Sequence, residues 1–274
     1  MAYTSDNFID VDGIKTHYLE AGNGDQTIVL IHGGGAGADS IGNWDGVIPR
    51  LEDDYHVIAV DMLGFGRTDK PGGDFIYSQA ARTQHMIGFL KALEIKRPML
   101  VGNSMGGCTA LGVSIEAPDM VERQILMGSA GLNAAITPAM LPIVNYDFTL
   151  EGMELLVDAL TGPKYVKDPD MIKRRYELAN DPDTKRAYAA TMGWIKEAGG
   201  LAYEEGYIVK CKVPTLVVNG KEDLVVPIEN AYKFLELIEN SWGHIVPHCG
   251  HWAMIEHADD FAAITRHFST MEVH

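Results

Sequence analysis

The sequence predicts an α/β fold: one mostly parallel sheet of eight strands, with helices on both faces and a helical insertion late in the chain. Two observations lead to this prediction. Short apolar runs alternate with helical patterns, and most are separated by 15 residues or more, which suits parallel strands joined by crossover helices. The alternation then stops for almost ninety residues, between positions 127 and 215, which indicates an inserted segment.

Eight short apolar runs are the candidate strands. They span residues 7–11, 15–20, 27–31, 56–60, 98–101, 124–127, 215–218 and 244–246. The first two are joined at Asp12-Gly13, a dipeptide typical of tight hairpin turns, so we expect this pair to be antiparallel. The later runs are expected to be parallel.

Three segments have the pattern of helices that bury one face. In the segment 78–93, Ser78 is suited to cap the N-terminus. Its apolar side recurs at helical spacing, through Thr83, Met86, Ile87, Leu90 and Leu93. The other two segments span 228–238 and 259–268.

The inserted segment, residues 133–206, is rich in helix formers but contains five prolines. Because proline interrupts helices, several short helices fit better than one long helix. We expect this segment to form a lid over the carboxyl edge of the sheet. The remaining residues, 1–132 and 207–274, would form the core.

Composition and charge narrow the class of partner. The chain has 274 residues, 46% of them hydrophobic, and a formal net charge of −16 without a basic block. We therefore expect neither nucleic acid nor a membrane as a partner, and an anionic substrate would need a local cation. The polar N-terminal ten residues lack a signal-peptide core, which favours the cytoplasm. The three cysteines are odd in number and widely spaced, so neither a metal site nor a disulfide is expected.

The most informative motif is Gly102-Asn103-Ser104-Met105-Gly106. It directly follows the apolar run 98–101 and precedes a stretch of small residues suited to a helix. This is the context of a nucleophile elbow, in which a tight strand-to-helix turn exposes a serine hydroxyl. Ser104 is therefore the candidate nucleophile.

A serine hydroxyl needs a base to take its proton and a carboxylate to orient that base. In enzymes with a nucleophile elbow these residues follow the serine in the order acid, then histidine, each after a strand. Asp223 lies beyond the strand 215–218, and His251 lies beyond the strand 244–246. Both have the required order and local context.

Two neighbours are alternatives for these roles. His248 is the rival base, although Gly250 before His251 suits a tight loop better. Glu222 is the rival carboxylate, which we expect to face solvent. The remaining histidines are expected to be structural or on the surface.

The oxyanion of an acyl-transfer reaction needs two N–H donors. The residue after the nucleophile, Met105, supplies one, and a loop after an early strand supplies the other. The glycine-rich loop 32–37 directly follows the strand 27–31, and Gly34 is the candidate donor.

The same loop permits a different interpretation. Gly33, Gly35 and Ala38 match the G-x-G-x-x-G/A pattern of dinucleotide-binding proteins. However, Asp61 lies 28 residues after Gly33, beyond the usual ~20, and residues 39–44 are a poor start for the long helix required. We therefore favour the hydrolytic interpretation.

Four motifs carry a family resemblance. They are the loop 32–38 with Asn43-Trp44, and the segments 61–66, 102–107 and 249–252. With them the chain resembles, over essentially its whole length, the meta-cleavage product hydrolases. These α/β-hydrolase-fold enzymes hydrolyse carbon–carbon bonds in bacterial aromatic degradation. Many esterases share the elbow, so Asn43 with Asn103 and the pair His251-Trp252 are more specific. Ala36 replaces the loop's common proline, as in the carbazole-type branch, which the chain resembles most.

The resemblance implies roles for individual residues. Ser104, Asp223 and His251 would form a catalytic triad, with Gly34 and Met105 as the oxyanion hole. Arg175 would bind the dienoate end of the substrate, although charge pattern alone places it in a basic run on the surface and leaves Arg174 as an alternative. The remaining substrate-binding residues would be Gly35, Asn43, Asn103 and Trp252.

The implied substrates are 2-hydroxy-6-oxo-6-arylhexa-2,4-dienoates, cleaved without a cofactor to 2-hydroxypenta-2,4-dienoate and an aromatic carboxylic acid. The alternatives are a C–C hydrolase for 6-alkyl substrates, and a carboxylesterase or perhydrolase with the same triad. The resemblance also suggests a homo-oligomer.

Overall fold

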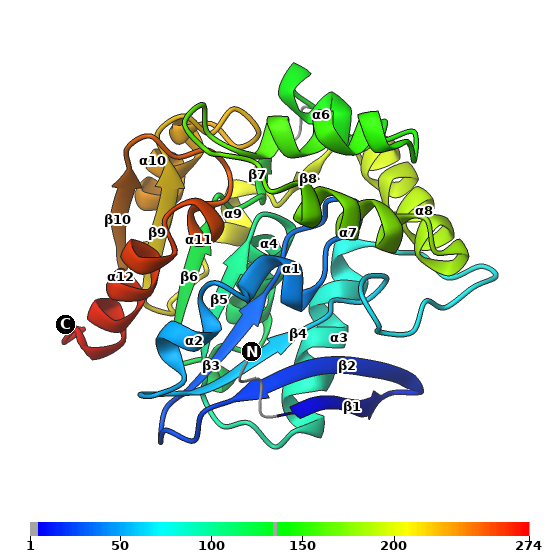
Figure 1. Cartoon of the computed structure of the whole chain (residues 1–274). Coiled ribbons are helices and arrows are strands. Elements are labelled where there is room, and N and C mark those ends of the chain that lie inside the picture. The colour runs from blue at the N-terminus through cyan, green and yellow to red at the C-terminus, as the bar shows by residue number, and fades with distance from the viewer. Residues whose placement is uncertain (1–4, 134–135, 274) are drawn as a thin grey trace.

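The computed structural model describes residues 5–133 and 136–273. Residues 1–4, which begin the acidic N-terminal segment, and residues 134–135 of the expected lid lie outside it. An eight-stranded sheet forms the centre, in the order β1-β2-β4-β3-β5-β6-β9-β10 (Figure 1). The strands are β1 (Ser5–Val11), β2 (Ile14–Ala21), β3 (Thr27–Ile31), β4 (His56–Val60), β5 (Met99–Asn103), β6 (Arg123–Met127), β9 (Thr215–Gly220) and β10 (Ser241–Val246).

The antiparallel hairpin and the parallel later strands are as predicted, whereas the pairing of β2 with β4 was not predicted. β1 and β2 are antiparallel, as are β2 and β4, and the remaining neighbours are parallel. The hairpin turns at Asp12 and Gly13, where φ is 52° and 84°. These positive values suit a type I′ turn, which explains the Asp-Gly dipeptide.

The predicted helices are confirmed and cover both faces of the sheet. On one face α3 (Gln79–Ala92) packs against α4 (Met105–Glu116), and on the other α2 (Ile48–Leu51) packs against α12 (Ala258–Thr270) (Figure 1). Ser78 caps α3, since its Oγ accepts a hydrogen bond from the N–H of Ala81 at 3.1 Å. The third predicted helix is α10 (Ile228–Leu237), and shorter helices are α1 (Ser40–Trp44), α9 (Glu205–Ile208) and α11 (Ala253–Glu256).

Four helices form a layer beyond the carboxyl ends of the parallel strands (Figure 1). They are α5 (Leu141–Val144), α6 (Leu150–Leu160), α7 (Pro169–Ala179) and α8 (Pro182–Ala198). Prolines open α7 and α8, as expected for residues that break helices but fit their first turn. We call α5–α8 the lid helices.

A small second sheet, which the sequence did not predict, lies beside the lid helices. It pairs β7 (Leu132–Asn133) with β8 (Leu201–Ala202), one at each end of the inserted segment. Two short 3-10 helices span Pro118–Met120 and Pro138–Met140. Within the described ranges, no helix combines the length and apolarity needed to cross a bilayer.

Candidate active site

Ser104 lies at the tight turn between β5 and α4. Its φ of 56° and ψ of −117° are unusual for a residue with a side chain. The turn is fixed because the N–H of Ser104 donates to the carbonyl of Met127 at 3.0 Å. A Cβ atom at Gly106 would lie 2.3 Å from the carbonyl oxygen of Ile31, so only glycine fits there. This is the local geometry of a nucleophile elbow.

His251 and Asp223 form a buried pair. Nδ1 of His251 lies 2.7 Å from Oδ2 of Asp223, and the imidazole is 1% exposed. The other carboxylate oxygen accepts the N–H groups of Val225 and Val226, each at 2.9 Å. Among the described residues, Nε2 of His251 has no partner. The pair therefore presents a free, oriented imidazole nitrogen.

A residue that the sequence did not single out makes room for this pair. Gly128 follows β6 and has a φ of 49°. A Cβ atom there would lie 3.0 Å from Nδ1 of His251 and 3.2 Å from Oδ2 of Asp223. The signal available in the sequence was a glycine directly after a predicted strand.

The two rival residues lie elsewhere. The side chain of His248 is 59% exposed, with Nδ1 3.9 Å from Oε1 of Glu222. The second oxygen of Glu222 accepts the N–H of Cys249 at 3.0 Å. Neither residue lines the pocket beside Ser104.

One pocket brings the predicted site residues together. Of the residues predicted for the site, all but Asp223 line it: Ser104, His251, Gly34, Met105, Gly35, Asn43, Asn103, Arg175 and Trp252.

A buried guanidinium marks the polar end of the pocket. Arg175 of α7 is 1% exposed, and its Nη2 donates to the carbonyl of Ala36 at 3.0 Å. Its guanidinium carbon lies 4.9 Å from the ring centroid of Trp252. Among the described residues Nε and Nη1 have no partner, and burial lowers the pKa of Arg175 to about 10. A buried cation with unpaired N–H groups favours an anionic ligand, which would supply the missing partners.

Two amides lie at the same pocket. Nδ2 of Asn103 donates to the carbonyl oxygens of Met127 at 3.2 Å and His251 at 3.4 Å, which leaves its Oδ1 buried without a partner among the described residues. The Oδ1 atom of Asn43 is likewise buried and unpartnered. The pocket thus offers two acceptors for a ligand donor.

Arg174 faces away from this pocket. Its Nη1 lies 3.1 Å from Oδ1 of Asp39, and its Nη2 contacts Oδ2 of the same carboxylate. Asp39 also caps α1 by accepting the N–H of Gly42 at 2.7 Å. Of the two candidate arginines, only Arg175 lines the pocket.

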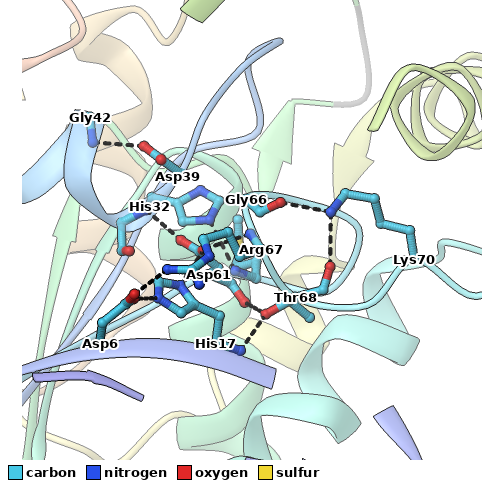
Figure 2. A network of polar contacts seen from close by, with 12 residues as sticks. Asp6, His17, His32, Asp39, Gly42, Asp61, Gly66, Arg67, Thr68 and Lys70 are labelled. Atoms are coloured by element: carbon cyan, nitrogen blue, oxygen red, sulfur yellow. Dashed lines mark hydrogen bonds and ion pairs between the residues drawn. The ribbon is translucent and has the colours of Figure 1, made fainter. Parts of the chain in front are cut away.

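A buried carboxylate, Asp61, binds the start of α1, a few residues after the glycine-rich loop, and Figure 2 shows it among its partners. Its Oδ1 accepts the N–H of Ser40 at 2.7 Å, and its Oδ2 accepts the N–H of Arg67 at 2.8 Å and lies 2.6 Å from Nδ1 of His17. The loop enters the five-residue helix α1. A dinucleotide site needs a long helix after the loop and a carboxylate that is free to bind a ribose. Here the helix is short and the carboxylate of Asp61 is already hydrogen-bonded, so the loop does not match such a site.

The far end of the pocket is apolar. Leu141 of the lid is exposed. The apolar residues that line this end are Met140, Ile143, Val144, Leu160, Met192, Ile195, Leu201 and Val225. Nothing in the local pattern separates these residues from ordinary core positions.

The chain is similar to known proteins over most of its length. Residues 26–258 match the family model of the α/β hydrolase fold, so the chain belongs to that family. The chain is 55% identical to the 2-hydroxy-6-oxo-6-(2′-aminophenyl)hexa-2,4-dienoic acid hydrolase of Metapseudomonas resinovorans, over 96% of this chain and 90% of the relative. Within the α/β hydrolases it belongs to the meta-cleavage product hydrolases, a family of enzymes that cleave C–C bonds.

Two solved structures are close in shape. One is a serine hydrolase involved in carbazole degradation, with a TM-score of 0.90 and 53% identity over 98% of this chain and 99% of that one. The other is a meta-cleavage product hydrolase, with a TM-score of 0.89 and 33% identity over 96% and 97% of the two chains. The fold and the family expected from the sequence are confirmed.

Proposed function

We propose that this chain hydrolyses the C5–C6 bond of 2-hydroxy-6-oxo-6-arylhexa-2,4-dienoates. The proposal rests on one observation: a candidate nucleophile, a candidate base and a buried cation line the same pocket. Ser104 and the free nitrogen of His251 lie at the same pocket as the buried, incompletely paired guanidinium of Arg175. A simple ester needs no such cation, whereas a dienoate carboxylate does.

The residues take distinct roles in this reaction. The carboxylate of the substrate pairs with Arg175, and the 2-hydroxyl group donates to the amide oxygens of Asn43 and Asn103. Ketonisation moves the hydroxyl proton to C5 with help from His251. Ser104 then adds to the C6 carbonyl as His251 takes its proton.

Cleavage follows from this adduct. The N–H groups of Gly34 and Met105 hold the C6 oxyanion; losing one such donor typically costs about 3–4 kcal/mol. The electron pair of the C5–C6 bond moves through the enone to the C2 oxygen, which takes up a proton. Water activated by His251 then hydrolyses the acyl ester on Ser104 and releases the aromatic acid. Asp223 orients His251 throughout.

The apolar end of the pocket supports an aryl group at C6. Met140, Ile143 and Val144 there come from the lid, together with Met192 and Ile195 of α8. We assign residues 133–206 to a substrate-selecting lid and the rest of the chain to the hydrolase core. Alkyl groups would leave part of this surface in contact with water and bind more weakly.

The first test uses 2-hydroxy-6-oxo-6-phenylhexa-2,4-dienoate with native protein and Ser104→Ala. Loss of the yellow dienolate absorbance and chromatography of the products report cleavage. We expect benzoate and 2-hydroxypenta-2,4-dienoate from the native protein. The variant should ketonise the substrate but cleave it about 10⁴-fold or more slowly. Brisk hydrolysis of a nitrophenyl ester without dienoate cleavage would identify an esterase instead.

The second test compares the adjacent arginines. Arg175→Gln should raise KM about tenfold to a hundredfold, because a charge-assisted hydrogen bond contributes about 1.5–3 kcal/mol. Arg174→Gln is the matched control, since its side chain pairs with Asp39 outside the pocket. Equal effects of the two changes would contradict the assignment of Arg175 as the anchor.

A further inference from the structure

The loop that carries His251 is joined to the lid through main-chain contacts. The N–H of His251 donates to the carbonyl oxygen of Leu160, at the end of α6, at 3.0 Å. A Cβ atom at Gly250 would lie 2.5 Å from the nitrogen of Gly162, so the two backbones pack directly against each other. Leu160 also lines the pocket.

One carboxylate bridges this junction. Oε2 of Glu256 accepts the N–H of Gly162 at 2.8 Å, and Oε1 accepts the N–H of Gly250 at 3.0 Å. Gly162 follows the lid helix α6, and Gly250 immediately precedes His251. Burial raises the pKa of Glu256, whereas the two N–H donors favour its charged form. A single side chain thus holds the lid and the base loop to each other.

A second glutamate, Glu222, lies in the core and binds the same loop. Oε2 of Glu222 accepts the N–H of Cys249 at 3.0 Å, and the N–H of Glu222 donates to the carbonyl of Cys249 at 2.9 Å. Each glutamate therefore accepts a main-chain N–H from the two residues that precede His251. Of the two glutamates, only Glu256 also accepts an N–H from the lid.

We propose that Glu256 is a positioning residue, which keeps the imidazole of His251 aligned with Ser104 by locking the base loop to the end of α6. The inference rests on the proposed function, because it assigns His251 as the base. A consequence is that a shift of the lid at Gly162 is transmitted to His251 through a carboxylate outside the pocket.

The test is Glu256→Gln, a change that keeps the size of the side chain. Glutamine supplies one acceptor oxygen, and its NH₂ group would face the second N–H donor, so one bridge bond is lost. We expect kcat for 6-phenyl dienoate cleavage to fall about tenfold to a hundredfold with KM within about twofold. An unchanged kcat, or a rise in KM alone, would overturn the proposal.

Amide hydrogen exchange gives a readout that does not depend on catalysis. The N–H of His251 bonds to Leu160 and not to Glu256, yet its exchange should accelerate at least tenfold in Glu256→Gln. Glu222→Gln is the control, in which the His251 amide should stay slow. Faster exchange at Gly162 and Gly250 alone, or equal acceleration at His251 in the control, would overturn the proposal.

The two readouts separate this proposal from the proposed function. If the native protein does not cleave the dienoate, the function fails, and exchange of the His251 amide still decides whether Glu256 couples the loop to the lid.

Discussion

Two buried histidine–aspartate pairs, His251 with Asp223 and His17 with Asp61, differ in whether the second ring nitrogen of the histidine has a partner. Nδ1 of His251 lies 2.7 Å from Asp223, and Nδ1 of His17 lies 2.6 Å from Asp61. Both imidazoles are almost completely buried. The pairs differ at Nε2, which has no partner in His251 among the described residues but contacts a second carboxylate, Asp6, in His17 (Figure 2).

The second carboxylate changes the chemistry of the imidazole. Burial lowers the pKa of His17, but the hydrogen bonds that Asp61 and Asp6 accept from it, together with the charge of Asp61, outweigh burial and raise this pKa above its ordinary value. Asp61 in turn has its pKa lowered to about 2, since the attraction and hydrogen bond of His17 outweigh the cost of burial. Because both ring nitrogens of His17 contact carboxylates, neither is available to take a proton from a substrate, so this pair holds loops together. A contact between histidine and aspartate is therefore not sufficient to identify a catalytic base.

The largest expected contrast is between the two aspartates. Asp223→Asn should lower kcat about 10⁴-fold, because the amide orients the wrong tautomer of His251. Asp61→Asn should leave kcat within about tenfold at a temperature where the variant is folded. Steady-state cleavage of the 6-phenyl dienoate, with circular dichroism as the folding control, measures both. Comparable losses of kcat in the two variants would remove the distinction.

The expected effects on stability are smaller than those on kcat. Here the substitution in the His17 pair, and not the one in the His251 pair, should have the larger effect. His17→Gln removes the imidazole that both carboxylates share and leaves the buried Asp61 without this partner, so the free energy of unfolding should fall by about 3–5 kcal/mol. His251→Gln should change it by less, since only one carboxylate loses its partner. Urea unfolding followed by fluorescence gives both values. If His17→Gln were as stable as the native protein, its network would not be structural.

The smallest effect is the pH dependence of stability. Because the pKa of His17 is raised in the folded protein, its contribution is fully present below its unfolded value of about 6.5. That contribution is lost as the pH rises through the higher folded value. Native protein should therefore lose stability relative to His17→Gln as the pH rises above about 6.5 and through the raised pKa of His17. Parallel urea midpoints for the two proteins over this range would contradict the raised pKa.

The sequence predicted the sheet and the main helices, and it singled out the candidate reactive residues that the structure brings to one site, because each has a local signature. The elbow around Ser104 follows a strand, and the order of Asp223 and His251 is imposed by the strands before them. The hairpin at Asp12-Gly13 was predicted from its turn chemistry. These features depend on residues close together in the chain.

Features formed by distant segments were not predicted. Asp6, His17 and Asp61 share no motif, and two-residue strands such as β7 show no periodicity. Arg175 was assigned from family resemblance, because its charge pattern indicated a solvated surface. Its burial depends on Gly37, where a Cβ atom would lie 2.1 Å from the carbonyl oxygen of Arg175.

The most direct test of the comparison is cleavage of 2-hydroxy-6-oxo-6-phenylhexa-2,4-dienoate by His251→Gln and His17→Gln, under single-turnover conditions at a temperature where both are folded. We expect the cleavage rate to fall about 10⁴-fold or more in His251→Gln and less than about tenfold in His17→Gln. Similar cleavage rates for the two variants, or the reverse order, would contradict it.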